Sequence, residues 1–376
     1  MALKVGIVGM NSIGYSHAPT HFASPLADLV AICDAVKERA DKAAEQFKCK
    51  AYYSLDDMLA NEELDVVDCA TGGLENGGWH YEPAMQAMEA GKHVLVEKPI
   101  SSNIEQAREM VDVATAMDVY LGCDLNHYFT PTADKAKQYQ DEGKLGELVY
   151  CLCKMGFQGG EPETAVAPGS PKIKDFPYFH LKAFLTHPLS VMRYFCGDVT
   201  HVQAFLNRPG FRRSVNDVML STASIHLKFA NDTVGYLLSQ RGDASYGLGG
   251  WWSCEVAGTK GTFCIENCIE RTTFWSAPDA ARGPGKPGFI NPGEPGAPEI
   301  FESGTHDFGQ TFNRRITAFL EDITNNVPKH QLRGSGRDAL AVIEYTFAII
   351  ESYESGGALV RPNPLPPLYV KPEEMP

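Results

Sequence analysis

Residues 91–99 read GKHVLVEKP, and this stretch decides how the first part of the chain folds. Residues 94–97 (VLVE) have the apolar character of a buried parallel strand. Pro99 has no N–H to donate to a β-ladder, so the strand must end before it. Lys98 is therefore placed at the carboxyl end of a strand, where open α/β sheets bind their ligands. An ammonium held at that edge is a candidate proton donor and acceptor.

The composition is that of an ordinary globular protein. The 376 residues predict two domains, with 44% hydrophobic and 21% charged residues. A net charge of -14 without a basic cluster argues against nucleic acid and anionic membranes as partners. No apolar run reaches about 18 residues, so no membrane span is expected, and the strand-like start leaves no room for a secretory signal. The ten cysteines are scattered, so we expect a reduced, cytoplasmic protein.

The first third of the chain alternates short apolar runs with helical patterns. The expected strands are residues 3–8, 28–33, 65–69, 92–97 and 119–123. The expected helices are residues 35–47, 80–90 and 103–117. This alternation predicts a doubly wound parallel sheet, the Rossmann arrangement of an α/β domain, over residues 1–124.

The pattern changes after residue 125. The expected strands become longer, at residues 147–157, 199–207, 218–229, 233–240, 252–257 and 261–266. The expected helices are residues 131–142, 181–195, 308–325 and 336–355. Residues 277–304 are rich in Pro and Gly and predict a long surface loop. We expect residues 125–376 to form an α+β domain with a large, open, mostly antiparallel sheet.

A glycine turn follows the first expected strand. Gly9 and Gly14 match the first and third glycines of the dinucleotide fingerprint Gly-x-Gly-x-x-Gly, and Asn11 occupies the second position. Asn tolerates a left-handed backbone, so the turn remains feasible. The second strand ends in Asp34, whose carboxylate can accept hydrogen bonds from ribose hydroxyls and repel a 2′-phosphate. This favours NAD over NADP, although Arg39 keeps NADP open, and Asp34 could instead cap the next helix.

With the glycine turn, the acidic strand end and residues 97–99 (EKP), the chain resembles the Gfo/Idh/MocA oxidoreductase family over nearly its whole length. Residues 125–131 (LNHYFTP) and 256–262 (VAGTKGT) also carry the resemblance. It implies NAD(P)-dependent oxidation of a sugar, inositol or related polyol held between a Rossmann domain and an α/β domain. It also implies that Lys98 is the catalytic lysine and that the second sheet forms the contact of a homodimer or homotetramer.

The family pattern has a second catalytic region, Asp-x-x-x-His followed three residues later by Asp. The best match here, AFLTHPLS, keeps His187. Ala183 and Ser190 stand where the two carboxylates belong. The orientation of the histidine must therefore come from elsewhere, or its role is altered. His180 and Lys182 lie on the same stretch and could replace the missing polar groups.

Oxidation of a secondary alcohol needs a hydride acceptor and a base within hydrogen-bond reach of the hydroxyl proton. We assign the base to His187, because an unperturbed imidazole titrates near neutral pH. Lys98 would stabilise the developing alkoxide and relay the proton, or act as the base itself if burial lowers its pKa, and Asn126 would bind substrate or cofactor. The structural alternatives are a helix-buried imidazole at His187 and a partly solvated Lys98 paired with Glu97.

Two polar segments could reach the site as loops. Residues 71–80 (TGGLENGGWH) follow an expected strand at its carboxyl end, where ligands bind. Residues 240–252 combine Gly, aromatic and charged residues, which suits either a carbohydrate site or a surface hairpin with its tryptophans in the core. The expected cofactor contacts are Gly9, Asn11, Ser12, Ile13, Gly14, Asp34, Thr71, Trp79, His80, Glu97, Lys98 and Asn126. The expected substrate contacts are Lys98, Asn126, His180, Lys182, His187 and Arg241.

Other chemistries find less support. The histidines are interpreted as lacking the helical or finger spacing of metal ligands, so no metal site is expected. A Gly-x-Ser-x-Gly motif is present only as a fragment at residues 334–336, which argues against a serine hydrolase. Three functions stay open: a dehydrogenase acting on a sugar, glycoside or cyclitol hydroxyl; hydrolysis or epimerisation through transient oxidation by tightly held NAD; and a non-catalytic sugar or nucleotide sensor.

Overall fold

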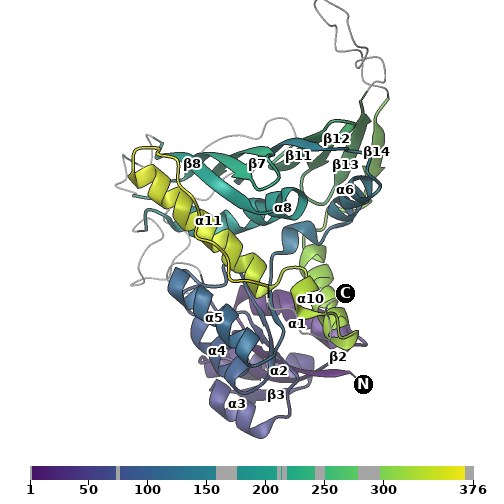
Figure 1. The fold of residues 1–376 in the computed structure, drawn as a ribbon. Coiled ribbons are helices and arrows are strands. Elements are labelled where there is room, and N and C mark those ends of the chain that lie inside the picture. The colour runs from purple at the N-terminus through teal and green to yellow at the C-terminus, as the bar shows by residue number, and fades with distance from the viewer. Residues whose placement is uncertain are drawn as a thin grey trace, which may run out of the picture.

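A computed structural model describes residues 2–72, 77–157, 176–209, 213, 218–241, 250–277 and 297–368. These residues form two sheets, one within each expected part of the chain (Figure 1). The predicted fold class, a parallel Rossmann sheet followed by a mostly antiparallel open sheet, is confirmed.

The first sheet has six parallel strands in the order β3-β2-β1-β4-β5-β6. Its strands are β1 (Leu3–Val8), β2 (Ala27–Cys33), β3 (Lys50–Tyr52), β4 (Val66–Cys69), β5 (His93–Val96) and β6 (Leu121–Cys123). Its helices are α1 (Ser12–Ala23), α2 (Lys37–Phe47), α3 (Leu55–Asn61), α4 (Tyr81–Glu89) and α5 (Ile104–Ala116).

Strand β5 is apolar because helices cover both of its faces. Val94 and Val96 belong to the large core cluster that includes apolar side chains of α4 and α5. Leu95, which points to the opposite face, belongs to a second cluster with Ile316 and Phe319. Burial on both faces therefore explains the continuous apolar run that decides the fold.

The described part of the second sheet has eight strands in the order β14-β13-β12-β11-β7-β10-β9-β8, and among these strands only the β10–β7 pair is parallel. Its strands are β7 (Leu148–Phe157), β8 (Val199–Asn207), β9 (Thr222–Phe229), β10 (Val234–Arg241), β11 (Trp252–Gly258), β12 (Gly261–Glu266), β13 (Arg271–Ser276) and β14 (Glu299–Glu302). The helices that accompany it are η1 (Asn126–Tyr128), α6 (Pro131–Asp141), α7 (Phe179–Phe184), α8 (Thr186–Cys196), α10 (Gln310–Thr324), η4 (Lys329–Gln331) and α11 (Gly336–Glu354). Within the described ranges, no helix has the length and apolar character needed to span a membrane.

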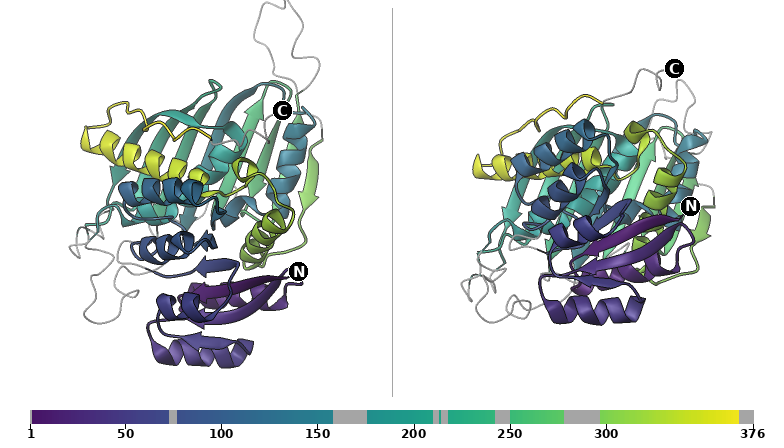
Figure 2. Two further views of the ribbon diagram at one scale, coloured as in Figure 1. Left: turned by 60° about the horizontal axis from the view of Figure 1, so that its bottom comes forward. Right: turned by 90° about the horizontal axis from the view of Figure 1, so that it is seen from below.

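The two parts of the chain pack through helices. Helices α6, α8 and α11 lie on the side of the second sheet that faces the first domain (Figures 1 and 2). Helix α10 follows the second sheet in sequence but packs against α1. Its residues Ile316 and Phe319 share a core cluster with Val5 and Ile7 of the first sheet. The division at residue 124 stays a prediction, and α10 is a later segment that completes the core of the first sheet.

The structure differs from the expected elements in several segments. The helix expected over 181–195 is two helices, α7 and α8, which meet at Leu185. Strands β3, β13 and β14 and helices α1 and α3 were not among the expected elements, and Pro19 inside α1 interrupts its helical pattern in the sequence. Strand β14 lies inside the expected loop 277–304, of which residues 278–296 are outside the described ranges. A strand of three or four residues, such as β3 or β14, is too short to show a periodic pattern in the sequence. Its strand geometry depends on hydrogen bonds to a partner that is distant in sequence, as β2 is for β3.

Candidate active site

The turn between β1 and α1 is closely packed. Gly9 has φ +95, and a Cβ there would lie 2.8 Å from the backbone nitrogen of Thr71. A Cβ on Gly14 would lie 2.0 Å from the carbonyl oxygen of Gly9. Asn11 has φ -91 and makes no side-chain cap of α1, so the left-handed conformation considered for it is not used. Neither glycine can take a side chain without movement of the backbone, as a turn that approaches a dinucleotide requires.

Asp34 anchors this turn from the end of β2. Its carboxylate accepts hydrogen bonds from the backbone N–H of Met10 (2.7 Å) and of Val36 (2.8 Å), and the side chain is buried. Helix α2 begins at Lys37, and its N-cap is Val36, so Asp34 is not a helix cap. Each carboxylate oxygen accepts one of these N–H groups and keeps a further lone pair for a ligand hydroxyl.

The loop after β4 is held by His80. The ring nitrogens of His80 lie 2.7 Å from the carbonyl oxygen of Pro99 and 2.5 Å from that of Thr71. Burial lowers the pKa of His80, and both nitrogens already face main-chain oxygens. The Thr71 hydroxyl donates to the carbonyl of Trp79, a residue that is 58% exposed. His80 therefore joins this loop to the turn after Lys98, whereas Trp79 is open to a ligand; residues 73–76 of the segment lie outside the described ranges.

Lys98 lies two residues after the end of β5, near the carboxyl strand end where the sequence predicted it. Its ammonium is 5.5 Å from the ring centroid of Phe184 on α7. The Arg241 guanidinium at the end of β10 lies over the same ring, 4.1 Å from its centroid. Among the described residues no ion pair joins Lys98 to Glu97; only the Lys98 backbone N–H donates to that carboxylate, at 3.1 Å. Strand alternation turns Glu97 inward and leaves the lysine partly exposed at the sheet edge.

His187 stacks on a second histidine that had not been singled out. The rings of His187 and His127 are 3.7 Å apart between centroids and inclined by 12°. Burial and the Lys98 charge lower the pKa of His127 to about 3. Burial, His127 and Lys98 lower the pKa of His187 well below its usual value. Both rings are therefore neutral at neutral pH, and the Nδ1 atoms of both lack a hydrogen-bond partner in the described structure.

The carboxylate positions beside His187 are filled by groups that do not orient its ring. Ala183 packs in an apolar cluster with Phe179 and Met219. The Ser190 hydroxyl donates to the backbone carbonyl of His187 at 2.8 Å. Among the described residues, the stacked ring of His127 is the aromatic contact of the His187 imidazole.

The remaining expected substrate residues are spread over several elements. His180 lies 2.9 Å from the Ser239 hydroxyl on β10. The Lys182 ammonium lies 5.4 Å from the ring centroid of Phe347 on α11. The Asn126 amide donates to Thr311 at 2.7 Å, and its buried Oδ1 has no hydrogen-bond partner among the described residues. Asn126 thus offers an acceptor to a ligand.

A group of buried ionisable side chains lies behind Lys98. We call it the His17 cluster; it contains His17, His21, Asp68, Glu97 and Asp124, all at most 4% exposed. His17 Nδ1 lies 3.1 and 3.0 Å from the two Asp68 oxygens, and His21 Nε2 lies 2.8 Å from Asp68. Burial opposes ionisation of Asp68, but the two histidines outweigh it and hold its pKa well below the usual range. The interpretation that no histidines have helical spacing is wrong, since His17 and His21 lie four residues apart on α1. That spacing was the feature of the sequence that could have indicated this cluster.

Comparisons with known proteins agree with this geometry. Residues 3–124 match the model of the oxidoreductase family with an NAD-binding Rossmann fold, and residues 133–264 match the Gfo/Idh/MocA C-terminal domain. A solved structure of levoglucosan dehydrogenase in complex with NADH and levoglucosan has a TM-score of 0.78 and 22% identity, and covers 96% of this chain and 100% of that one. At this identity the likeness shows the fold.

Curated relatives are more similar over shorter segments. D-glucoside 3-dehydrogenase of Escherichia coli is 32% identical over 166 residues, 44% of this chain and 46% of the relative. Levoglucosan dehydrogenase of Pseudarthrobacter phenanthrenivorans is 26% identical over 298 residues, 69% of this chain and 72% of the relative. An uncharacterised oxidoreductase of Streptococcus pneumoniae is matched over 51% of its length, so this chain spans about half the length of some relatives. With both family domains matched in order along the chain, this protein belongs to the Gfo/Idh/MocA oxidoreductase family.

Proposed function

We propose that this protein is an NAD-dependent dehydrogenase that oxidises a secondary hydroxyl of a sugar, glycoside or cyclitol. The observation that carries the proposal is that the Lys98 charge acts on the stacked His187–His127 pair and helps to lower the pKa of both rings, which are neutral. Lys98 stands at the same sheet edge as the glycine turn and Asp34. Relatives named as D-glucoside, levoglucosan and scyllo-inositol dehydrogenases support the substrate class.

The residues of the turn fit a dinucleotide. The lack of room for a Cβ at Gly9 and Gly14 suits a pyrophosphate close to the backbone, with α1 directing its N-terminus to the phosphates. Asp34 would accept hydrogen bonds from the ribose hydroxyls, and its charge disfavours NADP. The side chain of Asn126 would meet substrate or cofactor through Oδ1. Bound NAD supplies the hydride acceptor.

The proton is handled by this chain's own residues. A neutral His187 would accept the proton of the substrate hydroxyl, and its lowered pKa ensures that the acceptor form is present at neutral pH. The Lys98 ammonium would stabilise the alkoxide that develops as the proton leaves. His127 would hold the base in place by stacking, the task for which relatives of this pattern use a carboxylate.

The substrate side of the site combines an aromatic ring with hydrogen-bond donors. Phe184 offers a ring to the apolar face of a sugar, and Arg241 beside it offers donors to the hydroxyl groups. His180 and Lys182 remain proposed contacts for the more distant hydroxyls. No carboxylate is assigned to the substrate.

A substrate panel tests the proposal. The protein is incubated with NAD⁺ and with levoglucosan, alkyl glucosides, glucose, myo-inositol and scyllo-inositol, and NADH absorbance and products are recorded. Steady NADH formation is expected with at least one of these compounds. Product without NADH would instead indicate transient oxidation by held NAD, and ligand binding without turnover would indicate a sensor.

Replacing Asp34 tests the cofactor preference. In Asp34→Asn the ratio of the NADP⁺ to the NAD⁺ dissociation constant should fall by about tenfold or more, because a charged ribose acceptor is lost. The ratio is the measurement of choice, because damage to the turn would weaken both cofactors alike. Asp28→Asn, at the exposed start of the same strand, is the matched control and should leave the ratio unchanged. An unchanged ratio in Asp34→Asn would reduce this residue to an anchor of the turn.

The second sheet supports self-association as a homodimer or homotetramer. Val234, Leu238 and Leu152 are 55%, 37% and 45% exposed on neighbouring strands β10 and β7. They lie on the sheet face opposite to the core residues Leu237 and Cys153. Burying this apolar face against a second copy would remove it from water. Sedimentation should give a mass of two or four times 41.2 kDa, and a monomer at micromolar concentration would contradict this.

A further inference from the structure

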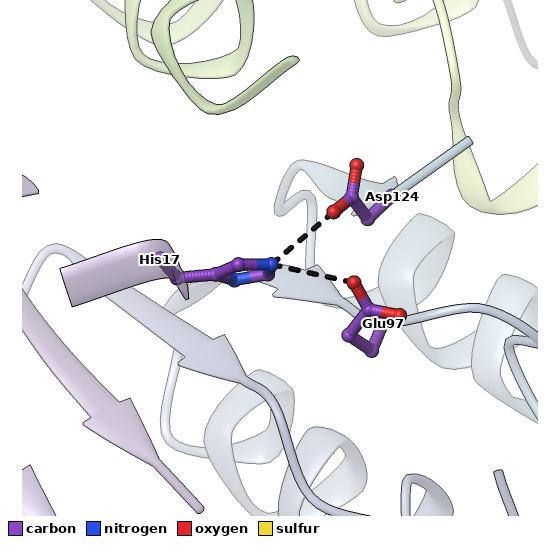
Figure 3. Close-up of side chains that lie close together, drawn as sticks. All are labelled: His17, Glu97 and Asp124. Atoms are coloured by element: carbon purple, nitrogen blue, oxygen red, sulfur yellow. Dashed lines mark ion pairs between the residues drawn. The ribbon is translucent and has the colours of Figure 1, made fainter. Parts of the chain in front are cut away.

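The His17 cluster brings three ligand-type atoms to one point from elements far apart in the chain. His17 lies on α1, Glu97 follows β5, and Asp124 follows β6 (Figure 3). His17 Nε2 is 3.3 Å from Glu97 Oε1 and 3.2 Å from Asp124 Oδ2. All three side chains are almost entirely shielded from solvent. The cluster does not belong to the proton chemistry proposed above.

The other atoms of these side chains are already engaged or oriented. His17 Nδ1 faces both Asp68 oxygens, so it carries the hydrogen and a neutral ring presents a lone pair at Nε2. This carboxylate–histidine arrangement is the one that orients histidine ligands in metal sites. Glu97 accepts the Lys98 N–H through Oε2 and directs Oε1 inward.

The inward atoms do not satisfy one another. His17 Nε2, Glu97 Oε1 and both Asp124 oxygens are buried without a hydrogen bond of good geometry. The ring nitrogen therefore points between the two carboxylates rather than at either one. Two ligands bound to one ion at about 2.1 Å, at angles between about 90° and 109°, lie about 3.0–3.4 Å apart. The two separations from His17 Nε2, 3.2 and 3.3 Å, fall in this range, and all three ligand atoms lie within 4.8 Å of one another.

The charge of the cluster also calls for a cation. Asp68, Glu97 and Asp124 are three carboxylates in a site without solvent, where uncompensated charge is very costly. We propose that His17, Glu97 and Asp124 bind a divalent cation of the Zn²⁺ type, with Asp68 as the outer carboxylate that orients His17. One imidazole and two carboxylates are suitable ligands for such an ion. The ion would tie α1, which carries the nucleotide turn, to the strand ends that carry Lys98 and lead into Asn126.

A proton could take the place of the proposed metal ion between His17, Glu97 and Asp124. Burial disfavours the charged His17 ring, but the carboxylates outweigh it and raise the pKa of His17 well above its usual value. Burial and the Glu97 charge raise the pKa of Asp124 to about 7, so a proton on His17 or on Asp124 could occupy the same point. In that case no ion would be bound, and the two states can be separated directly.

The metal content of the protein distinguishes a bound ion from a bound proton. The untagged protein is stripped with a chelator, dialysed into metal-free buffer and titrated with Zn²⁺ or Co²⁺ by calorimetry, with bound metal measured by mass spectrometry. We expect one ion per chain, a dissociation constant in the micromolar range or below, and a higher melting temperature in the loaded protein. Absence of a stoichiometric ion in the wild-type protein would overturn the proposal, whatever the variants do.

Variants locate the ion. His17→Gln should weaken binding by at least about 100-fold, as should the near-isosteric Asp124→Asn. His21→Gln is the matched control, because His21 is equally buried and contacts Asp68 but lies outside the three proposed ligands. Equal binding by His17→Gln and wild type would place the ion elsewhere and overturn the assignment. No sugar or NAD is added, so the result is independent of the proposed dehydrogenase activity.

Discussion

Lys98→Met should lower kcat on the preferred sugar or cyclitol by about 10²–10³-fold, while NAD⁺ affinity stays within about threefold. Methionine keeps most of the length and apolar stem but removes the ammonium beside Phe184. The alkoxide that develops in the transition state would then lose its nearest cation, whereas the glycine turn and Asp34 would remain intact. Steady-state kinetics and cofactor titration measure the two quantities separately.

The matched control for this variant is Lys92→Met. Lys92 precedes the same strand at its opposite end, so its removal tests for a general effect on β5 without touching the ligand edge. Its turnover should stay within about twofold of wild type. If Lys98→Met turned over as fast as Lys92→Met, Lys98 would have no role in the chemistry, and the geometry at the strand end would be structural.

His187→Asn should lower kcat by about 10²–10⁴-fold with little change in KM, because it removes the proposed general base. Asparagine retains polar atoms in the space of the ring but cannot accept a proton at neutral pH. Single-turnover formation of NADH, measured at saturating substrate, reports this step without product release. A loss confined to KM would mean that His187 only binds the substrate.

Variants of two neighbours of His187 distinguish a role in proton transfer from a role in positioning the imidazole. Ser190→Ala removes only a hydroxyl bonded to the His187 carbonyl, and turnover should change by less than about threefold. His127→Ala removes the stacked ring and should reduce kcat, whereas His127→Phe keeps a ring and should restore much of it. Equal activity in the Ala and Phe variants would show that stacking does not orient the base.

Local patterns carried most of the prediction for the first domain. The run 94–97, Pro99 and the glycine turn are neighbours in sequence, and a parallel strand buried on both faces has an apolar character that can be read directly. Asp34 at the end of β2 was found for the same reason. Short elements such as β3 were missed, because three residues acquire strand geometry only by pairing with a distant strand.

The residues proposed to handle the substrate proton could be predicted from the sequence only in part. His187 and Lys98 stood in recognisable motifs, and the absence of carboxylates at Ala183 and Ser190 was visible in the sequence. What replaces them was not visible, because His127 lies 60 positions away in sequence and meets His187 only when η1 packs against α8. The same packing, with burial and the Lys98 charge, lowers the pKa of both rings.

The family, the parallel first sheet and the place of Lys98 near a strand end could all be inferred from the amino-acid sequence, since each depends on residues close together in the chain. Tertiary structure alone decided that His127 stacks on His187 and that α10 completes the first core. It also decided that His17, Glu97 and Asp124 converge. These three come from a helix and two strand ends, and a parallel sheet gathers the ends of its strands at one edge whatever their separation in sequence. Burial then determines the free-energy cost of ionising these side chains, because that cost depends on the surrounding dielectric and not on the residues adjacent in sequence.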